Sequence, residues 1–193
     1  MPSSRRHVNT VVTATAIAVG VALAGCSSAA STAKTAAPHG QGANPVAWVG
    51  EYCSGLAEVV TAQVQAAKMP ATPQGHKDGL IMVADTAQQA FTNVAHHLTQ
   101  LGPPAITDGT RVQDTMVGFF TTAAATVGDR RARLTALDAN DPNFAQKADQ
   151  QLSGPHLSAA TTQMQGLSNN HDLASAFNTA PQCQHLRDTA THE

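Results

Sequence analysis

The side chains that could carry chemistry in this sequence are three cysteines and nine histidines. A thiol can be acylated, oxidised to a disulfide or used as a metal ligand, and an imidazole can act as a base or a ligand. Cys26 stands at the end of an apolar run near the N-terminus, whereas Cys53 and Cys183 stand far apart in the rest of the chain. None of the three has the CxxC spacing of a redox or metal-binding pair.

The residues before Cys26 have the order of an export signal. Arg5 and Arg6 form a short basic region, residues 11–23 carry no charge, and small residues follow. The stretch Leu23-Ala24-Gly25-Cys26 resembles the lipobox of bacterial lipoproteins. The resemblance implies that the Cys26 thiol receives a diacylglyceryl group and that residues 1–25 are removed. Cys26 would then be a lipid-anchored first residue at the outer face of the cell membrane.

Two other interpretations of these residues are an ordinary secretory signal and an N-terminal transmembrane helix. The apolar run is shorter than the ~20 residues that a helix needs to span a bilayer, and no Ala-x-Ala tripeptide immediately precedes Cys26. We therefore expect a lipoprotein signal peptide over 1–25, the lipidated cysteine with a flexible tether over 26–43, and a helical domain over 44–193. The tether consists mostly of Ser, Ala, Thr and Gly, which bury too little apolar surface to order.

Lipidation of Cys26 would leave Cys53 and Cys183 as a natural pair. Such a pair can stay oxidised outside the cytoplasm, and we expect a disulfide between them. It would close a long loop, which in the chain-entropy account contributes up to about 5 kcal/mol. A reactive or metal-binding pair of cysteines is the alternative.

The histidines follow no catalytic or metal-binding motif. His96 and His97 are adjacent, so on a helix they point about 100° apart. The sequence has no HExxH, no Glu-x-x-His, no GxSxG and no Gly-rich phosphate loop. His171-Asp172 and the pair Cys183 and His185 have no recognisable catalytic partner. We expect no enzymatic activity, no cofactor and no metal, with a weak surface metal site as the alternative.

Charge and composition narrow the classes of fold and partner. Of the eleven Lys and Arg, Arg5 and Arg6 lie in the signal, so nine remain against thirteen Asp and Glu, a formal charge of −4. This mild acidity argues against nucleic acid as a partner, because nucleic-acid binders usually show a basic face. Aromatic residues make up only 4% of the chain, which favours closely packed helices over a β-sandwich.

Helix starts are marked by capping residues. Asn44-Pro45, Thr72-Pro73 and Asp141-Pro142 each pair an N-cap residue with a proline at the first helical position. Thr110 and Gln113 have the spacing of a capping box.

Apolar residues repeat every three or four positions between these starts, which predicts amphipathic helices. We predict helices over 45–69, 74–101, 109–139 and 142–168, and a short one near 171–178. Short links make neighbouring helices antiparallel. The expected fold class is all-α: an antiparallel up-down bundle of about four helices, with a disulfide that ties the C-terminal segment to the first helix.

Two further groups could form contact surfaces. Asp129-Arg130-Arg131-Ala132-Arg133 is the one concentrated charge cluster, and Arg130 falls on the apolar repeat. This charge cluster could contact anionic lipid headgroups or an acidic partner. Alternatively, it is a solvated helix face on which Asp129 pairs with Arg133. Trp48 and Tyr52 lie one turn apart beside Cys53, and we expect them to pack over the disulfide rather than to form a ligand rim.

The Ala-, Thr- and Gln-rich composition and the pattern Trp48-x-x-x-Tyr52-Cys53 are loosely similar to small helical secreted lipoproteins of actinobacteria, many of which have no assigned function. We expect a non-enzymatic interaction or structural module, held at the membrane by its lipid and contacting an envelope protein. One alternative is a carrier of a small apolar ligand in a cavity between helices. The other is a metal-handling protein that uses the histidines.

Overall fold

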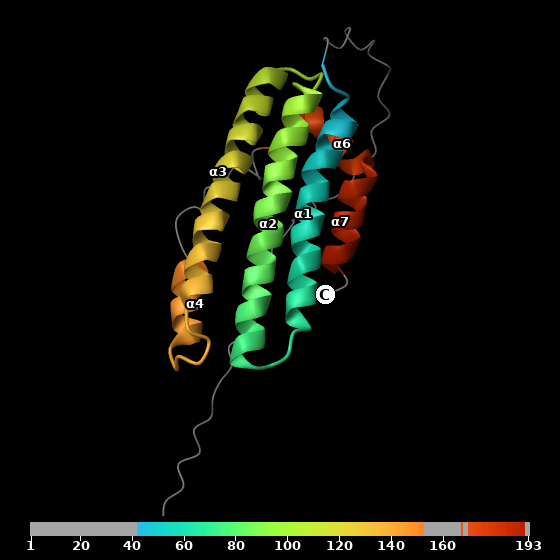
Figure 1. The fold of residues 1–193 in the computed structure, drawn as a ribbon. Helices are drawn as coiled ribbons and strands as arrows, with labels where there is room; N and C mark the ends of the chain where they lie inside the picture. The colour runs from blue at the N-terminus through green and yellow to red at the C-terminus, as the bar shows by residue number, and fades with distance from the viewer. Residues whose placement is uncertain (1–41, 153–166, 168–169, 192–193) are drawn as a thin grey trace, which may run out of the picture. The chain divides into compact units, whose positions relative to one another are not determined.

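The structure is a computed structural model that describes residues 42–152, 167 and 170–191. The described residues form six helices: α1 (Pro45–Ala67), α2 (Pro73–Leu101), α3 (Gly109–Ala136), α4 (Phe144–Leu152), α6 (His171–Thr179) and α7 (Pro181–Thr191). The three long helices lie side by side in chain order, α4 packs against α3, and α6 and α7 pack against α1 (Figure 1). The short connections make α1, α2 and α3 antiparallel to their neighbours. Among the described helices, none combines the length and the hydropathy of a transmembrane span.

Two of the predicted helix starts are confirmed. The side chain of Asn44 accepts hydrogen bonds from the backbone N–H groups of Val46 and Ala47, at 2.8 and 3.4 Å. The hydroxyl of Thr72 accepts from Gly75 N–H at 3.0 Å. In both cases a proline follows the cap, where its missing N–H costs nothing.

For the third long helix the predicted start at residue 109 is confirmed but the predicted capping box is wrong, and the predicted start at Pro142 is wrong. α3 begins at Gly109, with Asp108 in the left-handed region at φ 57° and no side-chain cap. The side chain of Gln113 cannot form a capping box, because it is buried and accepts a hydrogen bond from the indole of Trp48. Asp141 does not begin a helix at Pro142. Its carboxylate accepts from Asn143 N–H in a turn, and α4 starts only at Phe144.

The all-α fold and the disulfide are confirmed, but the number of about four helices is not. α7 was not predicted from the sequence, where the last expected helix was the short one near 171–178. Proline at a first helical position can also begin one, and α7 starts at Pro181 two residues before Cys183. The third long helix ends at Ala136, three residues earlier than predicted. Of the predicted helix over 142–168, residues 153–166 and 168 lie outside the described residues.

The buried residues form two separate clusters. The larger one, here the disulfide-end core, is made by α1, α2, α3, α6 and α7; its largest members are Trp48, Tyr52, Leu98, Met116, Phe120 and Leu173. The smaller one, here the α4-end core, consists of Leu134, Phe144 and Ala148. At the disulfide-end core α1 and α2 approach closely: a Cβ on Gly55 would lie 2.2 Å from Val94 Cγ2, and Val94 belongs to that core. Small side chains therefore set the spacing of the two helices.

Candidate functional site

Cys53 and Cys183 form a disulfide that ties α7 to α1, with their Cα atoms 5.0 Å apart. Both residues are 2% exposed and belong to the disulfide-end core. The predicted pairing is confirmed, and the alternative of a reactive or metal-binding pair is wrong, because a disulfide has no free thiolate. Cys26 lies outside the described residues.

Trp48 and Tyr52 are core residues. Trp48 Nε1 donates to Gln113 Oε1 at 2.7 Å, and Gln113 Nε2 donates to the Leu98 carbonyl at 2.5 Å. These two hydrogen bonds pair the indole N–H and give the Leu98 carbonyl, which also accepts from the Gly102 N–H, a second donor. The ring of Tyr52 makes edge contacts with other aromatic rings, and burial raises the pKa of its phenol. Both residues therefore hold the core together and do not form an exposed ligand rim.

The histidines do not assemble a catalytic or metal centre in the described part of the chain. His97 Nδ1 lies 2.8 Å from Glu51 Oε2, with the two side chains 49% and 39% exposed. No side-chain hydroxyl or thiol among the described residues is hydrogen-bonded to an imidazole, and no group of three His, Cys, Asp or Glu lies at metal-binding distance there. His39, His156 and His192 lie outside the described residues.

The arginine cluster on α3 is used within the fold. Arg130 Nη1 donates to the Leu152 carbonyl at the end of α4, at 3.1 Å, which explains a charge on the apolar repeat. Arg131 forms an ion pair with Asp85 of α2, although its Nε is not aligned for a hydrogen bond. The ion pair between Asp129 and Arg133 expected from their spacing is not formed. Arg130 and Arg131 thus join helices, whereas Asp129 and Arg133 are exposed and make no such contact among the described residues.

Cations reach the C-terminal carbonyls of neighbouring helices at two further places. Lys77 Nζ of α2 donates to the Thr135 and Leu137 carbonyls at the end of α3, at 2.8 and 2.5 Å. Arg187 of α7 donates to the Phe177 carbonyl near the end of α6, at 3.0 Å. A positive charge at a helix C-terminus satisfies unpaired carbonyls and interacts favourably with the helix dipole. These basic residues are therefore structural.

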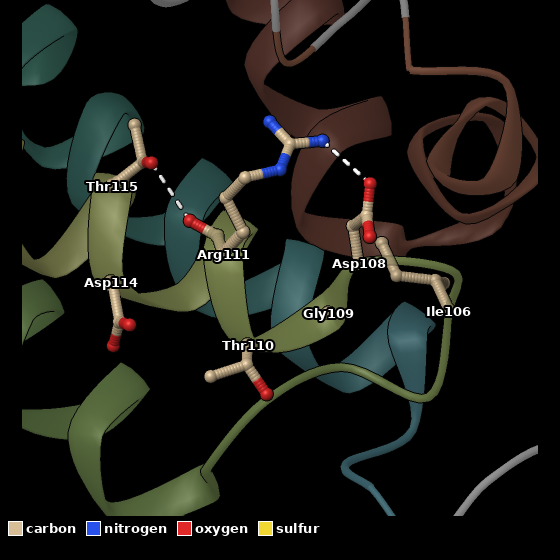
Figure 2. Close-up of a pocket in the computed structure, with 7 residues that line it drawn as sticks. All are labelled: Ile106, Asp108, Gly109, Thr110, Arg111, Asp114 and Thr115. Atoms are coloured by element: carbon tan, nitrogen blue, oxygen red, sulfur yellow. Dashed lines mark hydrogen bonds and ion pairs between the residues drawn. The ribbon is translucent and has the colours of Figure 1, made fainter.

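A hollow of about 660 Å³ lies at the N-terminus of α3 (Figure 2). Its polar groups are largely satisfied among themselves: Arg111 pairs with Asp108 at 2.8 Å, and the Thr115 hydroxyl donates to the Arg111 carbonyl at 2.7 Å. A Cβ on Gly109 would lie 2.1 Å from the Pro104 carbonyl oxygen, so the tight backbone packing excludes any other residue there. An anion drawn to the helix N-terminus would meet Asp108 and Asp114, which line the same hollow.

A second hollow, the α1–α7 groove, has a volume of about 670 Å³ and is lined by residues of α1, α2 and α7. Its floor includes Ala57 and Ala62. Seven polar side chains line it: Ser54, Glu58, Thr61, Gln65, Thr86, Gln182 and His185.

The polar side chains of the α1–α7 groove make no hydrogen bond or ion pair within the described residues. The contrast with other helical threonines is clear. Six of them on α2 and α3 turn the hydroxyl back onto the carbonyl four residues earlier: Thr92, Thr99, Thr115, Thr121, Thr126 and Thr135. Thr61 and Thr86 do not, so their donors remain available to an occupant. The groove thus gathers several unused hydrogen-bonding groups of the described residues in one hollow.

The walls of the groove are held by the core. α7 is fixed to α1 by the disulfide, and Gln182 crosses so close to α1 that a Cβ on Gly50 would lie 2.9 Å from its Oε1. On the other side the close approach at Gly55 fixes α2. A groove built on rigid helices presents its side chains in nearly constant positions.

Sequence reasoning missed every polar residue of the groove except His185, and it gave His185 no role there. Glu58 and Gln65 were available as a signal, because they are polar side chains in an Ala- and Val-rich stretch of helix. Glu58 and Gln65 come close to Gln182 only because α7 packs against α1, and a sequence pattern does not specify that packing. Compared with known proteins, the chain matches no protein-family model, no curated protein and no solved structure at a significant level.

Proposed function

We propose that this chain is a lipid-anchored protein of the bacterial cell envelope whose helical domain acts by binding a partner and not by catalysis. The observation that carries the binding role is the α1–α7 groove with its unpaired polar side chains. Such groups are solvated in the free protein and can bond an occupant without breaking an internal contact.

The anchor is supported by the sequence. Leu23-Ala24-Gly25-Cys26 fits a lipobox, and the residues from Ser27 to Ala43 suit a flexible tether between the lipid and the domain. The disulfide between Cys53 and Cys183 agrees with an oxidising compartment outside the cytoplasm. We place the protein at the outer face of the cell membrane.

A non-enzymatic role is supported by how the reactive residue types are used. Both described cysteines are consumed by the disulfide, and His97 is bonded to Glu51 without a nucleophile beside it. The two alternatives receive less support. An apolar ligand would need an enclosed apolar cavity, but both hollows are open and lined by polar groups, and large side chains fill the disulfide-end core. Metal handling would need three converging ligands, which the described residues do not provide.

The expected antiparallel up-down bundle of about four helices remains part of the proposal. Within the described residues, α1, α2 and α3 would be three of its members, and α4 would be the fourth because it packs against α3.

The experiment for the anchor is Cys26→Ala in the native cell, with Ser27→Ala as the matched control. We expect the wild type and Ser27→Ala to stay with the membrane after salt washing, because two acyl chains anchor stably. Cys26→Ala should block processing or release the domain, and the mass of the mature wild-type N-terminus should include the lipid. Unchanged processing and membrane partition in Cys26→Ala would overturn the anchor.

A further inference from the structure

We propose that the α1–α7 groove binds an extended segment of a partner protein, about five residues long, that carries one lysine or arginine among small residues. This inference rests on the proposed role as a binding module and specifies the chemistry of its partner.

The length of the groove suits a short extended peptide. Its polar side chains on α1 run from Ser54 to Gln65. At a rise of 1.5 Å per residue the helix covers roughly 16 Å over this distance. An extended chain advances about 3.3 Å per residue, so about five residues fill it.

The charge of the groove selects a cation. Glu58 is the one formally charged residue that lines the groove, and no lysine or arginine lines it. An acidic or phosphorylated partner would therefore meet a carboxylate and no counter-charge. Because the Glu58 side chain is exposed, its pairing with a lysine or arginine adds selectivity more than affinity.

The hydrogen-bonding groups match a peptide backbone. The side-chain amides of Gln65 and Gln182 each offer a donor and an acceptor, and the hydroxyls of Thr61 and Thr86 offer both as well. The small side chains of Ala57 and Ala62 let a backbone approach the helix surface, which favours small residues beside the cation.

Other polar ligands fit less well. Sugars and nucleobases commonly stack on aromatic side chains, and no Phe, Tyr or Trp lines the groove. His185 is the one ring available, at the wall on α7. A glycan is therefore the competing ligand class that the experiment has to exclude.

The test is an NMR titration of the ¹⁵N-labelled full chain carrying Cys26→Ala, held in micelles of an uncharged detergent. The probe is acetyl-Ala-Thr-Lys-Thr-Ala-amide, and its counterpart has Glu in place of Lys. We expect the lysine peptide to shift the backbone resonances of Glu58, Thr61, Thr86 and Gln182 with millimolar affinity. The glutamate peptide should leave these resonances unchanged.

Two variants with the same charge change sharpen the result. Glu58→Gln should weaken binding of the lysine peptide about three- to five-fold, as expected for an exposed ion pair. Asp114→Asn, which alters the hollow on α3, should leave it unchanged. Equal shifts with both peptides, no shifts in the groove, or an unaffected Glu58→Gln would overturn the proposal, as would binding of maltotetraose to the groove in place of the peptide.

A second measurement separates this inference from the proposed function. A photocrosslinking residue at Thr61, in the processed protein on cells, should join the domain to a specific partner if the domain is a binding module. Crosslinking to a partner that contacts the groove through an extended basic segment supports both proposals. Crosslinking to a glycan, or to a protein through a helical or acidic surface, overturns the peptide inference and leaves the binding role intact. No crosslinked partner at Thr61, although the protein is on the membrane, overturns the groove as the binding site.

Discussion

The two clusters of buried residues hold the same bundle by different means. In the disulfide-end core, large apolar side chains from five helices meet, and a disulfide joins two of those helices. In the α4-end core only Leu134, Phe144 and Ala148 are buried. Around this smaller cluster lie the cations that bond helix C-termini, Lys77 and Arg130, and two ion pairs, Arg131 with Asp85 and Lys147 with Asp141.

The difference shows how a chain with few aromatic residues distributes its stability. Apolar burial contributes roughly 25 cal/mol per Å², so the cluster that gathers Trp48, Phe120 and Met116 carries most of it. The α4 end buries little and depends more on charge-assisted bonds to carbonyls, which are individually modest. The residues of α7 that line the α1–α7 groove flank Cys183, so this wall of the groove depends mainly on the disulfide-end core.

The largest expected effect compares one phenylalanine from each core. Phe120→Ala should lower the free energy of unfolding by about 4–5 kcal/mol and Phe144→Ala by about 3 kcal/mol, at the two ends of the range for buried Phe→Ala changes. Phe120 is fully buried and has ring contacts with Tyr52 and Phe91, whereas Phe144 sits in the smaller cluster. Urea unfolding measures both. A larger loss for Phe144→Ala would reverse the comparison.

The next effect concerns the covalent link. Replacing Cys53 and Cys183 together by alanine, in the Cys26→Ala background, should cost about 3 kcal/mol, within the usual range for a disulfide that closes a long loop. Amide hydrogen exchange should rise first in α6 and α7, because these helices pack against α1 and each other in the described chain. If amide exchange rises first in α4, the disulfide does not stabilise α6 and α7 in preference to the rest of the bundle.

Much of the fold could be predicted from sequence where local chemistry decides it. Asn44-Pro45 and Thr72-Pro73 are caps whose partners lie within three residues, so a pattern is enough to identify them. Thr110 and Gln113 failed because a distant residue, Trp48, takes the side chain of Gln113. Tertiary contacts of this kind override a local signal, and no spacing rule reveals them.

The candidate site was harder to predict for the same reason. The pairing of Cys53 with Cys183 could be expected, because few pairings are possible among three cysteines. The groove could not, since it needs Glu58 of α1, Thr86 of α2 and Gln182 of α7 to meet across the packed helices. Arg130 looked anomalous on an apolar repeat until its carbonyl partner at Leu152 was visible.

A smaller effect tests the cation contacts of the α4 end. Lys77→Met should cost about 1–2 kcal/mol, because it leaves the Thr135 and Leu137 carbonyls without their charged donor. Lys68→Met is the matched control: the exposed Lys68 side chain has no bonded partner among the described residues, so the loss should stay within about 0.5 kcal/mol. Equal losses in thermal unfolding would mean that net charge, and not the carbonyl contacts, accounts for the effect.

The smallest effect is a pH dependence at the start of α4. The side-chain hydrogen bond from Lys147, followed by the backbone hydrogen bond from Asn143, holds the pKa of Asp141 below its usual value near 3.8. A carboxyl whose pKa is lower in the folded state stabilises the fold above its unfolded pKa, and this contribution disappears as the pH falls through the folded value. The stability difference between wild type and Asp141→Asn should therefore be constant above about pH 5 and shrink steadily below about pH 4. The shrinkage should be weaker in a Lys147→Met background, because the largest cause of the shift is then absent. If the difference keeps its full size down to pH 2, the Lys147 contact does not stabilise this end of the bundle through the charge of Asp141.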